Sequence, residues 1–550
     1  MSRLFSLYST VLPIIIGMAG TVLLMFFIIH WTVIVPDSAT YLRMAEEIQK
    51  GKWHIDQWAR GPYSGPPLYP MLVALTEWII PGFDRAGKIV AVMAASATII
   101  PLFFLARRFY GEKAGWAVIP LTVLNPWYLQ YVSQALTESL FTFLFLAGIV
   151  LTLYALAQNS PVLWFIVGIM AGSAWMTRDA GIIMPFFSIL WLAIGMWKKR
   201  CSPLGIVRNS GALLLGIILI YAPFKILMTL DQKSMHNTPK TSIAFNLIIP
   251  DLRNTMEREI YTSKLNGSST EYALTEAQKV SPKLSDALLQ HWRKILYRFG
   301  VNIGLMIASM YSMLGLIASL FVLIGISLGK SSLRKESERF PFPLLFIGSY
   351  IIIYFIFYAT AGGFTGALFP ERYLVPIIPL LGIWAVTGIL ISGEFIRKFK
   401  VKHLDKVIIL LCLGIILSIY LQNILQLRTF SQQRLKKVEF YKLLGESIRK
   451  ASHSHGMEEI SVMTRSPYLS YYSGASFVLL PYGEYPEVIK FAKQKGVDFL
   501  YVDVAVIFQR PQLSSLLNSN TSLPELERVY NKHSRKDNNK LLAVLYKIKK

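Results

Sequence analysis

The stretch WTVIVPDSATYLRMAEEIQKG, residues 31–51, decides the fold, because an acidic residue follows directly after an apolar run of membrane length. The run begins near residue 12, and a helix needs about 20 apolar residues to cross a bilayer. After Asp37 the pattern becomes amphipathic, which is typical of a helix lying in the membrane interface. We expect Tyr41, Leu42, Ala45 and Ile48 to face lipid, and Arg43, Glu46 and Glu47 to face water.

The composition is that of a polytopic membrane protein. Of the 550 residues, 53% are hydrophobic and 16% are charged, and the mean hydropathy is +0.45, which is too apolar for a soluble domain. The formal net charge is +24, but no nucleic-acid recognition motif accompanies it. We therefore assign the basic residues to orientation and to contact with anionic membrane lipids, and we expect no nucleic-acid partner.

The length criterion predicts about eleven transmembrane helices. They lie near residues 12–35, 86–106, 114–131, 137–157, 161–177, 180–197, 205–228, 300–328, 341–361, 373–392 and 407–425. Placing the N-terminus in the cytoplasm puts four basic groups on the cytoplasmic side, at 107–108, 198–200, 330–339 and 397–406, as the positive-inside rule requires. We expect a multi-pass protein of the inner (plasma) membrane with an uncleaved N-terminal anchor. The loops at 36–85, 229–297 and 362–372 then face the exoplasm.

The chain divides by pattern into a membrane domain, residues 1–428, and a tail, residues 429–550. In the tail, short apolar runs such as SFVLLP (476–481) and VDFLYVD (497–503) alternate with amphipathic stretches such as EVIKFAKQKG (487–496). This alternation predicts a small α/β domain on the exoplasmic (periplasmic) side. The predicted fold class is thus mainly α, with amphipathic helices in the outer loops and this domain at the C-terminal end.

Six cations lie at or near the outer ends of predicted spans, where the positive-inside rule makes them unusual. They are Arg60, Arg178, Lys225, Arg293, Arg298 and Arg372. Local ion pairs are one explanation, because Arg178 precedes Asp179 and Arg372 follows Glu371. Outer carboxylates are too few for all six, so we favour a phosphate or diphosphate at the lipid surface as their partner.

Two acidic residues are candidates for chemistry on the same side. Asp37 lies in the first outer loop, and Glu138 lies at the outer entrance of the fourth span, where a carboxylate costs free energy unless it is solvated, paired or used. Each has a simpler explanation as a residue at the start of a helix. Neither is decisive alone.

Taken in order, these stretches resemble the GT-C membrane glycosyltransferases, in particular the bacterial branch related to protein O-mannosyltransferases and the lipid A aminoarabinose transferase. The likeness covers most of the first 430 residues. The matching stretches, besides Asp37, are GPYSGPPLYPMLVAL (61–75), QALTESLF (134–141), GSAWMTRDAGIIMPF (172–186), PFKILM (223–228) and FPERYLVPIIPLL (369–381). Many relatives have an Arg-Asn pair after the proline of the fourth stretch, whereas this chain has Lys225, which keeps the charge without the guanidinium fork.

The resemblance implies transfer of a hexose or pentose, with inversion, from a polyprenyl-phosphate donor to a hydroxyl or similar acceptor on the outer face of the membrane. It places the catalytic carboxylates at Asp37 and Glu138. The six outer cations would bind the donor phosphate, since cations stabilise the negative charge that grows on a departing phosphate. We expect Tyr41, Tyr69, Glu371 and Tyr373 to line the substrate site.

The acceptor is a lipid, a glycan or a protein, and the sequence leaves this choice open. No cofactor is certain; a divalent metal is possible, although two separated carboxylates are a weak site without further ligands. The main alternative is a polymerase or ligase acting on polyprenyl-diphosphate glycans. A lipid or sugar transporter fits less well, because transporter acids lie near the bilayer midplane in repeat-related helices.

Overall fold

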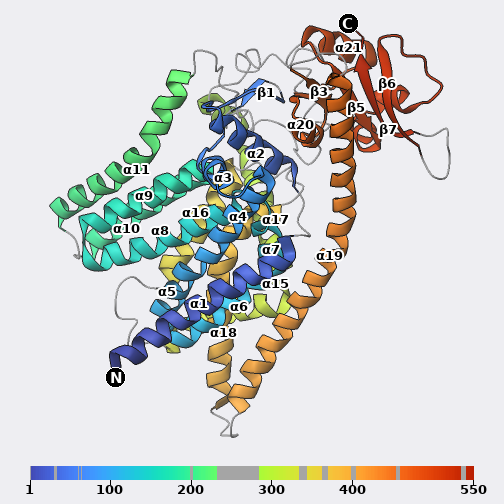
Figure 1. Cartoon of the computed structure of the whole chain (residues 1–550). Coiled ribbons are helices and arrows are strands. Elements are labelled where there is room, and N and C mark those ends of the chain that lie inside the picture. The colour runs from blue at the N-terminus through green and yellow to red at the C-terminus, as the bar shows by residue number, and fades with distance from the viewer. Residues whose placement is uncertain are drawn as a thin grey trace.

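The computed structural model forms a bundle of helices with a sheet-containing domain at one end (Figure 1). It describes residues 2–29, 34–59, 61–63, 65–198, 202–231, 284–332, 343–361, 370–397, 404–453, 459–533 and 541–549. The helices of the bundle are α1 (Ser2–Ile29), α2 (Pro36–Gln49), α3 (Leu68–Glu77), α4 (Phe83–Ala97), α5 (Ile99–Tyr110), α6 (Glu112–Val123), α7 (Pro126–Val132), α8 (Glu138–Gln158), α9 (Pro161–Thr177), α10 (Ile183–Trp197), α11 (Pro203–Asp231), α15 (Leu284–Ser332), α16 (Pro343–Ala361), α17 (Pro370–Leu374), α18 (Ile378–Arg397) and α19 (Leu404–His453), with short 3-10 turns η1 (Asp179–Ile182) and η2 (Val375–Ile377).

The predicted fold class is confirmed, and the predicted spans are helical where the structure describes them, with one exception. The span predicted at 114–131 is divided at Leu124 and Asn125 into the short helices α6 and α7. Six helical stretches among the described residues are long and apolar enough to cross a membrane: Phe83–Tyr110, Glu138–Gln158, Pro203–Leu227, Phe299–Gly329, Pro343–Thr360 and Glu371–Ile396. The remaining predicted spans have shorter apolar stretches among the described residues, such as Val11–Phe26 in α1 and Ile409–Leu425 in α19, so the number of crossings stays a prediction. Parts of three predicted basic loops, at 199–200, 333–339 and 398–403, lie outside the described residues.

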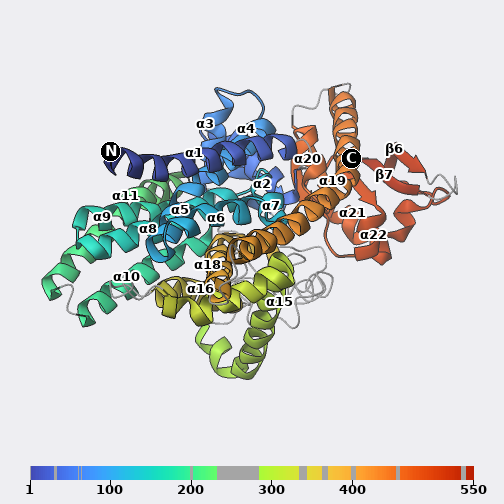
Figure 2. The same cartoon turned by 90° about the horizontal axis from the view of Figure 1, so that it is seen from below.

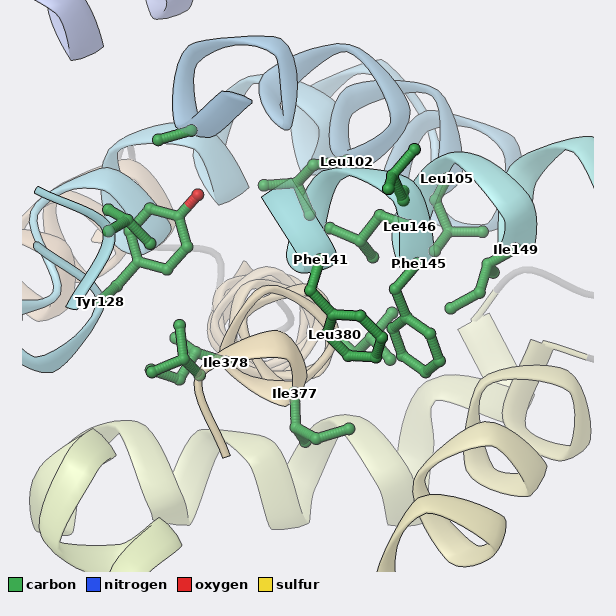
Figure 3. Close-up of a cluster of buried hydrophobic side chains, with 14 of the residues drawn as sticks. Leu102, Leu105, Tyr128, Phe141, Phe145, Leu146, Ile149, Ile377, Ile378 and Leu380 are labelled. Atoms are coloured by element: carbon green, nitrogen blue, oxygen red, sulfur yellow. The ribbon is translucent and has the colours of Figure 1, made fainter. Parts of the chain in front are cut away.

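A continuous apolar core fixes the start of α8. Figure 3 shows Phe141 and Phe145 of α8 near Leu102 of α5 and Leu380 of α18, and all four side chains are at most 5% exposed. Such interiors are packed closely, so the backbone at the N-terminal end of α8 has little freedom. The packing of Phe141 and Phe145 therefore fixes the position of Glu138, which lies one turn before Phe141.

Helices α15 and α18 approach each other through glycines. A Cβ atom at Gly325 of α15 would lie 2.0 Å from the carbonyl oxygen of Trp384, and one at Gly388 of α18 would lie 2.0 Å from that of Phe321. Membrane helices commonly pack in this way, because small residues let two backbones come close. Helix α18 follows α17 and η2 directly along the chain, so the contact between α15 and α18 also helps to fix the position of α17.

We expect Gly325→Leu to lower the stability of the protein by about 1 to 3 kcal/mol, because its side chain has to push α18 away. The melting temperature in detergent, followed by size-exclusion chromatography, measures this loss. Gly304→Leu on the same helix is the matched control, since a Cβ there meets nothing within 4 Å. Equal melting temperatures for the two variants would contradict the close contact.

Helix α2 is packed on two sides, which corrects part of its predicted orientation. Leu42 and Ala45 are fully buried in the bundle core instead of facing lipid, and a Cβ at Gly87 of α4 would lie 2.8 Å from Leu42. Glu47, expected to face water, is buried and forms an ion pair of 2.9 Å with Lys50. The sequence of α2 shows only that it has an apolar face and a polar face. In the fold, α3, α4 and the C-terminal domain cover residues of both faces.

The C-terminal domain has the predicted alternation of strands and helices. Its elements are β3 (Ser461–Thr464), α20 (Tyr468–Ser473), β4 (Ser476–Leu479), α21 (Tyr485–Gln494), β5 (Phe499–Asp503), α22 (Val504–Gln509), η3 (Pro511–Leu517), β6 (Leu526–His533) and β7 (Leu541–Ile548). Helix α19 runs along the right side of the bundle in Figure 1, and its last turns contribute Tyr441, Leu444 and Ile448 to a core of this domain. The boundary predicted at residues 428 and 429 falls inside this helix and stays a prediction.

Two strands of the sheet come from the loop at residues 36–85, and the sequence pattern did not predict them. They are β1 (Ile55–Ala59) and β2 (Gly61–Tyr63), and the strand order is β2-β1-β4-β3-β5-β7-β6. Strand β1 runs parallel to β4, with Trp58 opposite Phe477 and Ala59 opposite Val478. The loop that carries Asp37 and the C-terminal domain therefore share one sheet.

Candidate active site

Four charged side chains form a chain of ion pairs at the end of the bundle. Arg372 donates from Nε to Glu138 Oε1 and from Nη1 to Asp37 Oδ2. Arg178 Nη1 lies 2.8 Å from the same oxygen of Glu138. The order is thus Asp37, Arg372, Glu138, Arg178, with alternating charge. Two carboxylates and two guanidinium groups from separate segments of the chain meet in one place.

Each of the four residues is presented by the end of a helix or by a short one. Asp37 is in the first turn of α2, and Glu138 is the first residue of α8. Arg178 follows α9 in an extended conformation, with φ −154° and ψ 146°, so the chain turns there before η1. Arg372 lies in the five-residue helix α17. Helix termini from separate parts of the chain thus bring the four side chains together.

The simpler explanation of Asp37 as a helix cap does not describe its side chain. The N-cap of α2 is Val35, which makes no side-chain capping bond, and Pro36 occupies the first helical position. The Asp37 carboxylate instead accepts from Arg372. Likewise Thr137, at the N-cap of α8, makes no capping bond with its side chain. Both carboxylates thus have partners elsewhere in the fold.

Burial differs sharply along the chain of ion pairs. The Glu138 side chain is 0% exposed and lies between two arginines that are 12% and 16% exposed, whereas Asp37 is 53% exposed. A buried carboxylate requires partners of this kind, because its desolvation costs several kcal/mol. Asp37 is the member of the group that a substrate can reach from solvent. Glu138 Oε2 has no hydrogen-bond partner among the described residues.

Aromatic side chains surround Arg178. Its guanidinium lies 5.4 Å from the ring centroid of Tyr373 and 5.9 Å from that of Phe141. Tyr358 lies 5.4 Å from Tyr373 and 4.7 Å from Tyr354, ring centroid to centroid, and the Tyr354 hydroxyl donates to the Tyr373 carbonyl. Phe141 of α8 and Tyr373 of α17 thus hold the guanidinium by cation–π contact, and Tyr354 and Tyr358 of α16 support Tyr373.

The sequence analysis missed Tyr354 and Tyr358. A signal was available, because SYIIIYFIFY (349–358) places Tyr350, Tyr354 and Tyr358 four residues apart, which puts all three on one face of a helix. A polar-edged stripe of this kind inside a predicted span indicates a protein-facing side. Tyr373, which the sequence did select, completes the group.

Two other tyrosines were expected at the site: Tyr41 lies near Asp37, whereas Tyr69 is not accessible to a substrate. Tyr41 is half-buried on α2, and burial, followed by the nearby Asp37 charge, raises the pKa of its hydroxyl to about 12. Tyr69 is fully buried, 5.9 Å from Tyr41 by ring centroid, and donates to the carbonyl of Gly87 at 2.8 Å. Tyr69 therefore supports the packing of α3 on α4 rather than an open substrate surface.

The remaining predicted phosphate ligands are not members of the ion-pair chain. Lys225 is exposed near the end of α11, and Arg293 is exposed on α15 with its guanidinium 5.4 Å from the Trp292 ring centroid. Arg60 and the side chain of Arg298 lie outside the described residues. Glu371 is half-buried on α17 next to Arg372. Their roles at the site stay predictions.

A metal site is not formed by the described side chains. In the described ranges, no group of three or more His, Cys, Asp or Glu residues is arranged to hold an ion. The nearest approach to one is the pair Asp37 and Glu138, and Arg372 lies between them. A guanidinium already neutralises the position that a divalent cation would share with these two carboxylates.

A known family model matches part of the chain. Residues 64–226 match the family described as dolichyl-phosphate-mannose-protein mannosyltransferase. This segment, less than half of the chain, includes Glu138, Arg178 and Lys225 but neither Asp37 nor Arg372. None of the curated protein sequences matches the chain significantly.

Two solved structures are similar to the protein over nearly its full length. ArnT from Cupriavidus metallidurans, bound to undecaprenyl phosphate, is 13% identical, with a TM-score of 0.54 over 96% of this chain and 97% of that one. The oligosaccharyltransferase of Archaeoglobus fulgidus in the apo form is 12% identical, with a TM-score of 0.55 over 97% of this chain and 81% of that one. At such identities the likeness shows the fold, and it confirms the resemblance to the GT-C type.

Proposed function

We propose, from the premise that the chain has the GT-C fold, that it transfers a sugar from a polyprenyl-phosphate carrier to a hydroxyl or similar acceptor at the outer membrane surface. The observation that carries the proposal is the chain of ion pairs, in which the exposed Asp37 contacts Arg372 and the buried Glu138 links Arg372 to Arg178. Phosphate-linked polyprenols recur among the similar proteins, since the matching family is described by dolichyl-phosphate mannose and ArnT was solved with undecaprenyl phosphate.

Arg372 and Arg178 are the proposed phosphate clamp. Guanidinium groups bind phosphate oxygens through paired, charge-assisted hydrogen bonds. The phosphate leaves the anomeric carbon with growing negative charge, and fixed cations at that point lower the barrier. Glu138 touches both arginines and is fully buried, so its proposed role is to position them rather than to exchange a proton with substrate.

Asp37 is the proposed general base. An acceptor hydroxyl must lose its proton as its oxygen attacks the anomeric carbon, and a carboxylate within hydrogen-bonding reach can take that proton. A single displacement of this kind inverts the configuration at the anomeric carbon. A donor phosphate competes with Asp37 for Arg372, and the exposed Asp37 is the partner that can give way. Donor binding would thereby release the base for the acceptor.

The activity is testable with purified protein in lipid nanodiscs. A polyprenyl-phosphate sugar is supplied with extracted cell-envelope acceptors, and mass spectrometry follows release of polyprenyl phosphate and the mass gained by the acceptor. We expect both products to appear together. Movement of the intact sugar across liposomes without transfer would favour the transporter alternative and overturn the proposal.

The proposed orientation makes a separate prediction. Reporter fusions after residues 110, 200, 335 and 402 should report the cytoplasm, and fusions near 60, 265, 366 and 500 should report the exoplasm, because Lys and Arg accumulate in the first set of loops. Paired alkaline phosphatase and fluorescent protein fusions measure this in the inner membrane. An exoplasmic signal at residue 335 would place the ion-pair chain on the wrong side for a lipid-linked donor.

A further inference from the structure

The helix that carries Asp37 is held on a second side by the C-terminal domain. A small apolar cluster, separate from the bundle core, contains Met44 of α2, Ile55 of β1 and Phe477 of β4. All three are at most 4% exposed. Ile48 of α2 and Leu479 of β4 pack against them. Three segments distant in sequence thus meet over one face of α2.

Main-chain pairing reinforces this cluster. Strand β1, which begins six residues after α2 ends, runs parallel to β4, and the residue opposite Trp58 is Phe477 itself. Helix α20 adds a further contact, since Tyr471 and Tyr472 pack against the bundle core and Tyr472 also against the domain core. Figures 1 and 2 both show α20 beside α2.

The opposite side of α2 is held by the bundle. Leu42 packs against the position of Gly87, and the Gln49 side chain donates to the carbonyl of Ala74 at 2.9 Å and to Glu77 at 2.8 Å. The helix therefore lies between two supports. A helix rises about 1.5 Å per residue, so Met44 and Asp37 are about 10 Å apart along one short rigid rod.

We propose that the C-terminal domain positions the proposed base: Phe477, through Met44 and Ile55, fixes the tilt of α2 so that the Asp37 carboxylate meets Arg372. Phe477 is then a positioning residue, since it touches α2 and not the reacting groups. The inference rests on the proposed function for its effect on turnover, but its structural part stands on the contacts alone. Misplacing a reacting group by about 1 Å can cost on the order of a hundredfold in rate.

The test compares Phe477→Ala with Phe491→Ala in the full-length protein in nanodiscs. Phe491 is buried in a separate apolar cluster of the same domain, together with Val488 and Leu500. Its replacement therefore removes a side chain of the same size without changing a contact of α2. We expect Phe477→Ala to lower kcat by about ten- to a hundredfold with KM for the donor changed less than about threefold. Phe491→Ala should lower the melting temperature while keeping kcat within about threefold.

A second readout does not need activity. Hydrogen–deuterium exchange over α2 should rise in Phe477→Ala and remain unchanged in Phe491→Ala, and the swapped pair Met44→Phe with Phe477→Met should restore both exchange and kcat. If Phe477→Ala does not fold, Met44→Ala and Phe477→Leu take its place. Unchanged exchange over α2 overturns the positioning role. Absence of sugar transfer by the unmodified protein counts against the proposed function instead, and the exchange measurement still decides the inference.

Discussion

Arg372→Ala is expected to lower kcat/KM for the lipid-linked donor by roughly 10- to 150-fold, which corresponds to about 1.5 to 3 kcal/mol of lost stabilisation. Arg372 is the group shared by both carboxylates, and its removal takes away both a phosphate ligand and the link between Asp37 and Glu138. Arg178→Ala should have an effect of the same order, because it leaves the same buried Glu138 with one partner.

Arg43→Ala is the matched control for this loss. Arg43 is 19% exposed, close to the 16% of Arg372, and pairs with Glu46 at 2.7 Å on α2. Its removal should change kcat/KM for the donor less than about threefold, since Arg43 pairs with Glu46 and Glu47 on its own helix and is not a member of the ion-pair chain. Arg372→Lys should fall between the two, because one ammonium cannot reach both carboxylates. Full donor kinetics in folded Arg372→Ala and Arg178→Ala would assign both arginines a purely structural role.

The bundle could be predicted from the sequence because its signal is local. A run of about 20 apolar residues has few alternatives to a membrane helix. The predicted spans are helical where the structure describes them, except that 114–131 is divided into α6 and α7 at Leu124 and Asn125. The strands of the C-terminal domain could be predicted in the same way, except β6, which has too few apolar residues to be recognised as a strand. Helix α3, inside the first outer loop, was missed because its ten residues are too short for the length criterion.

The pairing of strands β1 and β2 with the C-terminal sheet could not be predicted in this way. Strand β1 pairs with β4 more than 400 residues later in the chain, and nothing in either stretch specifies a partner. Pairing of this range is decided by which edges the folded bundle brings together. The pairing covers one side of α2, and α3 and α4 cover the other. The amphipathic pattern of α2 alone could not show that protein, rather than lipid and water, lies on both sides.

The residues of the candidate site could be predicted from the sequence, but the ion pairs between them could not. The unusual outer cations and the resemblance selected Asp37, Glu138, Arg178 and Arg372 from the sequence. Their neighbours suggested local pairs, with Asp179 beside Arg178 and Glu371 beside Arg372. The structure joins them instead across separations of up to 335 residues. Charge alone cannot specify such a partner, because any exposed carboxylate on the same side would satisfy the same rule.

The role proposed for Asp37 separates two carboxylates that the sequence treats alike. Glu138 is buried between two arginines, so Glu138→Gln leaves two guanidinium groups without their shared counter-charge and should lower the melting temperature. Asp37 is half-exposed and does not cap its helix, so Asp37→Asn should leave stability nearly unchanged. A difference in stability together with a shared loss of turnover would identify one positioning and one reacting carboxylate.

Asp37→Asn is expected to fold, insert and bind donor, yet turn over at least about a hundredfold more slowly, because loss of a general base typically costs about 10² to 10⁴ in rate. Asparagine keeps the size of the side chain and an oxygen that can accept from Arg372, but it is neutral and cannot take up the proton. Asp84→Asn is the matched control, since Asp84 is also an acid in the first turn of a helix and pairs with Lys88 at 3.4 Å. Its turnover should stay within about twofold. Single-turnover rates at saturating donor and acceptor measure the chemical step directly. Near wild-type turnover in Asp37→Asn would remove Asp37 from the mechanism and make Glu138 the carboxylate to examine next.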